Sequence, residues 1–111
     1  MRYTLSICDN RIFRRLYSKG KSAASPCVVV YFRRNGRKEN RLGLTVGVKT
    51  GCAVVRNRIR RRLREIYRLS EELLVQGVDI VVVARSRAAK ADYHELEREL
   101  LGLFARLGLL K

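Results

Sequence analysis

The sequence has little of what protein enzymes use for catalysis. Among its 111 residues there is one histidine, there is no tryptophan, and only ten residues are acidic. A protein nuclease that acts alone usually carries clustered carboxylates or a histidine pair for metal binding or proton transfer. Neither pattern occurs, and His94 has no evident partner. We therefore expect His94 to be a surface residue, and the sequence offers no catalytic residue and no metal site.

Cysteines and long apolar runs are also scarce. The three cysteines, Cys8, Cys27 and Cys52, are odd in number, widely spaced and free of any CxxC pair. This pattern argues against a disulfide framework or a cysteine-based zinc site and favours reduced thiols. Cys27 lies in an apolar run, so we expect it in the core. No stretch approaches about eighteen apolar residues, and residues 1–10 lack the features of a secretory signal. We therefore expect a cytoplasmic protein with no membrane-spanning segment.

What the sequence has in excess is positive charge. Twenty-five Lys and Arg face ten Asp and Glu, which gives a formal net charge of +15. Such an excess repels itself in a compact state unless a polyanion neutralises it. Nucleic acid is the first candidate, because each cation placed on a phosphate releases counterions. An anionic membrane surface is the second, and a protein that is merely basic is the third. The length and the 47% of hydrophobic residues fit a single domain over residues 1–111.

Hydrophobic periodicity predicts six elements in the order α-β-β-α-β-α. The predicted helices span residues 9–19, 53–69 and 92–107, and the predicted strands span residues 27–33, 41–48 and 78–85. Asp9 or Asn10 caps the first helix and Gly20 ends it, while Asp92 and Glu95 form a capping box for the last. We expect an α+β fold: a two-layer sandwich in which helices cover a small mixed sheet.

The predicted strand at residues 41–48 has one apolar face and one nearly bare face. The apolar face carries Leu42, Leu44, Val46 and Val48, and the other carries Gly43, Thr45 and Gly47. Two interpretations of the bare face remain open. Another segment packs closely against it, or the glycines mark a bend or bulge in an edge strand.

The most informative segment is the predicted helix around VVRNRIRRRLREIYR, which holds seven arginines and one acid, Glu65. At roughly 100° per residue, its apolar side chains share one face. That face consists of Val55, Ile59, Leu63 and Ile66, and the opposite face consists of Asn57, Arg60, Arg61, Arg64 and Arg68. Arg56 and Arg58 fall near the two boundaries. Arg62 falls close to the apolar stripe, so its stem must run along that surface.

This pattern predicts a helix that docks on the sheet and presents a ridge of guanidinium groups. Guanidiniums bind phosphates bidentately and stack on bases, and the helix contains no lysine. A solvated helix face is the simpler alternative, although charges of nearly one sign disfavour it. A membrane-surface helix is a further alternative. It is disfavoured because the apolar face is narrow, lacks Trp and Phe, and is needed to cover the sheet.

The run Arg56-Asn57-Arg58 within AVVRNRIRRRLRE resembles the RNR signature of the bacterial ribonuclease P protein family. The resemblance covers most of the chain. RIFRRLYSKG at residues 11–20 is similar to the family's aromatic first helix, and residues 28–31, 41–48 and 79–85 are similar to its strands. Arg-Asn-Arg alone is a weak signal, but in this order and with these flanks it is highly specific. The chain departs from the family at Thr50, where a lysine is common, and at Cys52, where a polar or basic residue is common.

This resemblance implies a division of labour between protein and RNA. The RNA subunit is the catalyst and removes the 5′ leader of precursor tRNA, with Mg²⁺ bound through the RNA. The protein binds that RNA and also holds the leader in a cleft beside the first helix, with no protein partner required. The implied RNA contacts of the helix are Arg56, Asn57, Arg58, Arg60, Arg61, Arg64 and Arg68, and Lys49 is a further basic contact. The resemblance also implies a left-handed crossover between the strands at 41–48 and 78–85.

Three aromatic residues, Phe13, Tyr17 and Tyr31, match the family positions that line the leader cleft. Aromatic faces stack single-stranded bases without demanding a particular sequence. Aromatic residues at helical spacing are also common in protein cores. Both interpretations therefore remain open from the sequence.

Two other functions also remain open. Composition equally allows a basic structural ribosomal protein, which would co-purify with ribosomal subunits. An independent protein nuclease would cleave RNA without an RNA subunit.

Overall fold

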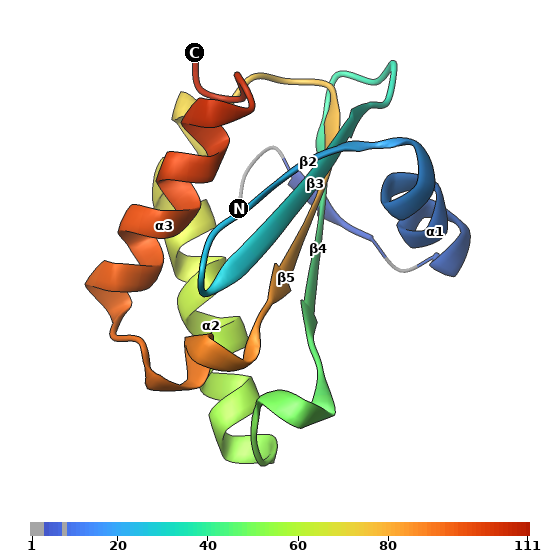
Figure 1. Ribbon diagram of the computed structural model, residues 1–111. Coiled ribbons are helices and arrows are strands. Elements are labelled where there is room, and N and C mark those ends of the chain that lie inside the picture. The colour runs from blue at the N-terminus through green and yellow to red at the C-terminus, as the bar shows by residue number, and fades with distance from the viewer. Residues whose placement is uncertain (1–3, 8) are drawn as a thin grey trace.

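The computed structural model describes residues 4–7 and 9–111, so the prediction for Cys8 lies outside the described residues. Its strands are β1 Thr4–Ser6, β2 Lys21–Ala24, β3 Val28–Arg34, β4 Asn40–Val46 and β5 Val78–Ala84. They form one mixed sheet in the order β1-β4-β5-β3-β2 (Figure 1). β4 runs parallel to β1 and β5, whereas β3 runs antiparallel to β5 and β2.

Three α-helices cover this sheet from both sides. They are α1 Asn10–Lys19, α2 Ala53–Ser70 and α3 Tyr93–Arg106. Helices α2 and α3 pack together on one face, and α1 crosses the other face (Figure 1). Three short 3₁₀ segments complete the fold: η1 Val48–Thr50, η2 Glu71–Leu73 and η3 Ser86–Lys90.

The predicted α+β fold around a mixed sheet is confirmed, and each predicted element is present with ends that differ by one or two residues. Asp9 caps α1 by accepting a hydrogen bond from the Arg11 N–H, and Asp92 caps α3 by accepting one from the Glu95 N–H. Strands β1 and β2 are not predicted from the sequence. The prediction that Val48 belongs to the strand is wrong: β4 ends at Val46, and Val48 lies in η1 with 75% of its surface exposed.

The main core lies between the sheet and the pair α2 and α3. Alternation along the central strands directs Val28, Val30, Ile80 and Val82 to this face. There they meet residues of the two helices that are fully buried, namely Ile59, Leu63, Leu96, Leu100 and Phe104. Burial of each such side chain stabilises the fold by about 1.5–3 kcal/mol. The expectation that Cys27 is a core residue is confirmed, because it is fully buried in the same cluster.

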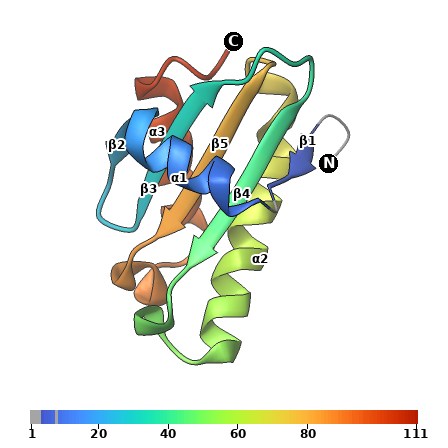
Figure 2. The ribbon, with the colours of Figure 1, turned by 90° about the vertical axis from the view of Figure 1, so that its right-hand side faces the viewer.

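The connection from β4 through α2 to β5 is left-handed. In Figure 2 both strands run downward, β5 lies to the left of β4, and α2 climbs behind the sheet. A path that descends on the right, rises at the back and descends on the left winds in the left-handed sense. About 98% of such crossovers in proteins are right-handed. The handedness implied by the family resemblance is therefore confirmed against the general rule.

A buried ion pair joins β4 to β5 on the face that α1 crosses. The Asp79 carboxylate accepts hydrogen bonds from Nε and Nη2 of Arg41, both at 2.7 Å. It also accepts one from the side-chain amide of Asn35 at 2.9 Å. Because Asp79 is buried, these three donors compensate for its lost hydration. They also fix the loop that leads from β3 to β4.

Candidate nucleic-acid interface

Helix α2 is held against the sheet by a narrow apolar stripe. Ile59, Leu63 and Ile66 are buried, as the periodicity predicts. Tyr67 is buried as well, which the sequence analysis does not predict. Its hydroxyl lies 2.8 Å from the hydroxyl of Thr4 in β1. The stripe fixes the rotation of α2 and thereby decides where each arginine points.

The outermost face of α2 carries exposed polar side chains: Asn57, Arg61, Arg64 and Arg68. Arg68 pairs with Glu65, with Nε and Oε2 separated by 3.0 Å, and this contact holds the pKa of the Glu65 carboxyl below its usual value. Within residues 4–7 and 9–111, no carboxylate pairs with Arg61 or Arg64. This face therefore presents cations that nothing in the described chain neutralises.

The flank of α2 nearest β4 carries half-buried arginines. Arg60 donates to the side-chain oxygen of Asn57 at 3.3 Å. Arg56 has its Nε shielded from solvent without an acceptor in the described chain. Arg60 and Arg64 line a hollow of about 190 Å³ at the edge of the sheet.

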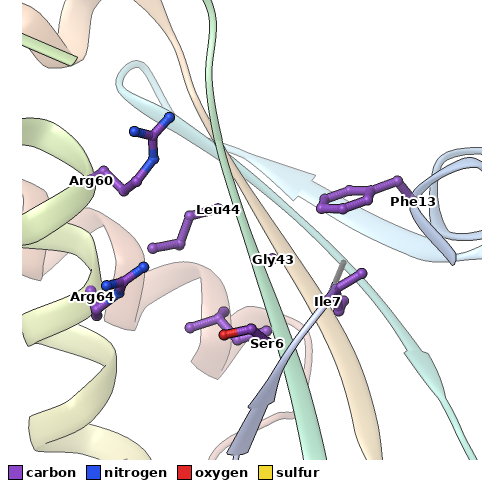
Figure 3. Close-up of a pocket in the computed structure, with 8 residues that line it drawn as sticks. Ser6, Ile7, Phe13, Gly43, Leu44, Arg60 and Arg64 are labelled. Carbon is purple, nitrogen blue, oxygen red and sulfur yellow. The ribbon is translucent and has the colours of Figure 1, made fainter. Parts of the chain in front are cut away.

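This hollow joins the two sides of the sheet. Among the described residues, the pairing of β1 with β4 ends at Leu42, whose carbonyl accepts from the Ile7 N–H at 2.9 Å. Figure 3 shows Arg60 and Arg64 on one side of β4 and Phe13 on the other. A chain of nucleotides that follows this edge would meet guanidinium groups on one side and an aromatic ring on the other.

The opposite flank of α2 faces η3. Arg58 donates from Nη2 to the backbone carbonyl of Ala89 at 3.4 Å, and Arg62 donates from Nη1 to that of Ala91 at 3.1 Å. This position of Arg62 agrees with the expectation that its stem follows the apolar surface. Its guanidinium, however, binds a backbone carbonyl of the protein. The seven arginines of this helix therefore occupy three different environments.

The three predicted aromatic residues lie together on the face of the sheet that α1 crosses. The ring centroids of Tyr17 and Tyr31 are 4.9 Å apart in an edge-on arrangement, and those of Phe13 and Tyr17 are 6.4 Å apart. Tyr17 is 44% exposed, and Phe13 and Tyr31 are half-buried around a small cluster formed by Ile7, Leu16 and Val81. The aromatic surface formed by Phe13, Tyr17 and Tyr31 thus combines packing with access to solvent.

The bare face of β4 is explained at Gly43 by close packing. A Cβ at Gly43 would lie 2.7 Å from two carbons of the Phe13 ring, whereas one at Gly47 would meet nothing within 4 Å. The first interpretation of this face is therefore confirmed at Gly43. Glycine is needed there because α1 rests directly on the strand.

Beyond α1 the same face of the sheet is open. A shallow hollow of about 550 Å³ is lined by residues at the ends of β4 and β5 and in the segments that follow them, including Thr45, Lys49, Val83 and Ser86. Lys49, which lines this hollow, is exposed, whereas Thr50 is buried. Cys52, just before α2, is exposed as well. Val83 packs in the same small cluster as Tyr31, so this hollow continues the aromatic surface.

Among the residues that the structure describes, Cys27, Glu95, Glu99 and His94 do not form a catalytic arrangement. Burial, together with a hydrogen bond from the thiol to Glu99, raises the pKa of Cys27 to about 12. Cys27, Glu95 and Glu99 lie close together, but the thiol stays protonated at neutral pH and the Glu99 carboxylate already accepts from the Cys27 N–H at 2.9 Å. His94 is exposed, and the centroid of its ring lies 5.9 Å from that of the Tyr93 ring. Among the described residues, no helix is both long and apolar enough to cross a membrane.

Comparisons with known proteins agree with this geometry. The family model described as Ribonuclease P matches residues 1–108. The ribonuclease P protein component of Natranaerobius thermophilus is 39% identical over 111 residues, which cover 100% of this chain and 96% of that protein. The corresponding protein of Alkaliphilus oremlandii is 42% identical over 101 residues, which cover 91% of this chain and 89% of that protein.

Solved structures show the same fold. The Staphylococcus aureus RNase P protein superimposes with a TM-score of 0.89 at 31% identity and covers 100% of both chains. The Thermotoga maritima protein gives a TM-score of 0.83 at 34% identity and covers 91% of this chain and 96% of that one. A ribosomal structural role is not favoured by any of these matches. The chain belongs to the family of ribonuclease P protein components, the protein subunits of a ribonucleoprotein endoribonuclease.

Proposed function

We propose that this chain is the protein subunit of ribonuclease P and that residues 1–111 act as one RNA-binding domain in the 5′ maturation of tRNA. It binds the catalytic RNA with α2 and the 5′ leader of precursor tRNA with the aromatic surface. The observation that carries the proposal is the hollow at the edge of β4, where Arg60 and Arg64 lie across the strand from Phe13. One protein surface can therefore hold two RNA segments side by side.

The outer face of α2 suits an RNA backbone. Arg61 and Arg64 are exposed and have no carboxylate partner in the described chain, and Arg60 lies beside them. Placing phosphates among these groups relieves their mutual repulsion and releases counterions. Planar guanidiniums add bidentate geometry that lysine lacks. Arg56, Asn57, Arg58, Arg68 and Lys49 complete the proposed contact set.

The aromatic surface suits a single strand of variable sequence. Exposed Tyr17 stands edge-on against Tyr31, and Phe13 lies one helical turn away. Stacking of a base on an aromatic ring contributes roughly 1–3 kcal/mol and is tolerant of sequence. An enzyme that processes many precursors needs such tolerance, because their leaders differ. The open hollow beyond Val83 extends this path toward Lys49.

The residues that the structure describes do not fit a Mg²⁺ site. Mg²⁺ prefers carboxylate and water oxygens in octahedral geometry. In the described part of the chain, the only cluster of potential ligands contains Cys27, a protonated thiol. We therefore propose that the Mg²⁺ is bound through the RNA subunit. We also propose that the enzyme acts in the cytoplasm, where precursor tRNA is made.

Reconstitution tests this proposal. Pure protein, ribonuclease P RNA and a 5′-labelled precursor tRNA are combined in Mg²⁺ buffer. We expect cleavage at the mature 5′ end with a lower KM when the protein is added to the RNA, and no cleavage by the protein alone. Cleavage without RNA would instead indicate a protein nuclease, and failure to change the kinetics of the RNA would refute the subunit role. Co-isolation from cells with ribosomal subunits, and not with ribonuclease P RNA, would point to a ribosomal protein.

A further inference from the structure

The segment η3 carries positive charge but no acid. Residues 85–91 read RSRAAKA, with Arg85, Arg87 and Lys90 as the charged residues. Arg85 is engaged, since it donates to the backbone carbonyl of Ser25 at 3.1 Å. Arg87 and Lys90 are exposed, and no carboxylate of the described chain pairs with either. Two cations of this short segment are thus left facing solvent.

The geometry of η3 places these two cations on one side. A 3₁₀ helix has three residues per turn, so residues three apart eclipse each other. Arg87 and Lys90 are separated by three positions, and so are Ala88 and Ala91. The two alanines are buried in the main core. The segment is therefore anchored by its alanines and turns its cations outward together.

Two arginines of α2 hold this segment in place. The guanidiniums of Arg58 and Arg62 donate to the carbonyls of Ala89 and Ala91, at 3.4 and 3.1 Å. The Arg58 Nε is shielded from solvent, so this side chain lies packed between α2 and η3. Segment η3 also packs against η1, which carries Lys49. Basic residues from η1, α2 and η3 therefore converge at one end of the molecule (Figure 1).

We infer that η3 is a further RNA-binding element whose Arg87 and Lys90 bind phosphates of the catalytic RNA, and that Arg58 and Arg62 are positioning residues that hold η3 beside α2. The inference rests on the proposed function for the identity of the RNA. It gives Arg58, besides its place in the proposed contact set, a second role through the backbone carbonyl that it holds. It also explains an arginine, Arg62, that lies too near the apolar stripe to reach an RNA on the outer face.

A thermodynamic cycle tests the inference. Affinity of the full chain for ribonuclease P RNA is measured at several salt concentrations for the wild type, Arg62→Met, the double variant Arg87→Gln/Lys90→Gln, and the triple variant. Met keeps the length of the Arg62 stem and removes only the guanidinium. Arg61→Met is the matched control, because Arg61 is exposed on the same helix, while the hydrogen bonds from α2 to the carbonyls of Ala89 and Ala91 come from Arg58 and Arg62.

We expect the double variant to lose about tenfold in affinity and to flatten the slope of log K against log salt by about 0.7–0.9 for each phosphate that is no longer neutralised. Arg62→Met should weaken binding about threefold in the wild type and hardly at all in the double variant, because its effect passes through η3. Arg61→Met should weaken binding equally in both backgrounds. An unchanged salt slope in the double variant, or an equal effect of Arg62→Met in both backgrounds, would overturn the inference.

Hydrogen exchange of the free protein supplies a second measurement that needs no RNA. The amides of Ala88 and Ala91 donate within η3, to the carbonyls of Arg85 and Ala88. Arg62→Met should speed their exchange several-fold while the amides of α3 stay protected. Unchanged exchange would show that Arg62 does not hold η3. If the wild type does not select ribonuclease P RNA over ribosomal RNA, the proposed function fails, and the exchange data still decide the positioning role.

Discussion

The Phe13 ring of α1 lies so close to Gly43 of β4 that a Cβ on the glycine would come within 2.7 Å of it. We expect Gly43→Ala to destabilise the protein by about 1–3 kcal/mol, the usual cost of overpacking, and to weaken precursor tRNA binding by displacing Phe13. Gly47→Ala is the control, since nothing lies within 4 Å of its added Cβ. Urea unfolding and precursor tRNA titration measure both effects. If the two variants had the same stability and the same affinity for precursor tRNA, the packing of α1 on β4 would not require glycine at position 43.

The aromatic surface gives a prediction about substrate discrimination. Tyr17→Ala and Tyr31→Ala should each weaken holoenzyme affinity for precursor tRNA about five- to a hundredfold, which corresponds to roughly 1–3 kcal/mol of stacking. Affinity for mature tRNA, which has no leader, should stay nearly unchanged. Tyr93→Ala serves as the control on another face of the molecule. If the affinities for precursor tRNA and for mature tRNA fell together, the tyrosines would support the fold and would not bind the leader.

The outer face of α2 gives a prediction about salt dependence. Arg60→Ala, Arg61→Ala and Arg64→Ala should each weaken binding to ribonuclease P RNA and flatten the salt slope by roughly one unit or less. Thermal unfolding should change little, because none of the three side chains belongs to the buried core. Arg37→Ala, in the loop before β4, controls for the loss of one charge. If the slope of log K against log salt were unchanged in all three variants, this face of α2 would not contact the RNA.

Two cysteines should differ sharply in reactivity. The backbone N–H groups of Val55 and Val54 at the start of α2 lower the pKa of exposed Cys52, whereas burial raises the pKa of Cys27 to about 12. The thiolate is the reactive form, so a lowered pKa increases the reactive fraction at a given pH and a raised pKa decreases it.

Alkylation with iodoacetamide at mildly alkaline pH, followed by peptide mass mapping, should therefore modify Cys52 first and Cys27 only after unfolding in urea. Bound ribonuclease P RNA should slow the reaction at Cys52, because this residue begins the helix that carries the arginines. Rapid modification of Cys27 in the native protein would contradict the buried placement.

Periodicity predicts the elements of this fold well where each element has a strong pattern of its own. The apolar stripe of α2 and the runs in β3 and β5 are set by local burial, and caps such as Asp9 and Asp92 are local as well. Strands β1 and β2 escape prediction because they are short edge strands with few apolar residues, held by their neighbours. Pairing partners, not local sequence, make them strands.

In the candidate site too, features set by local sequence can be predicted, and features set by tertiary neighbours cannot. The cations of α2 can be assigned to the surface from spacing alone. Their different environments depend on tertiary neighbours: Arg62 finds the carbonyl of Ala91, 29 positions away in the chain. The hydroxyl of buried Tyr67 meets that of Thr4, 63 positions away in the chain, and no pattern within α2 indicates this contact. The sequence shows that one face of this strand is bare at Gly43. Only the structure shows that the Phe13 ring packs there.

The position of β5 sets the order of events during synthesis. Strands β3 and β4 are consecutive in the chain but do not pair, because β5 lies between them. Neither strand meets its central neighbour until residues 78–84 have left the ribosome, which takes on the order of seconds after β4 is made. Until then α2 has no complete sheet to dock on, and its arginines emerge beside ribosomal RNA. A product cut short before Val78 would lack the central strand of the sheet, so the edges of β3 and β4 and the apolar faces that pack on β5 would stay uncovered.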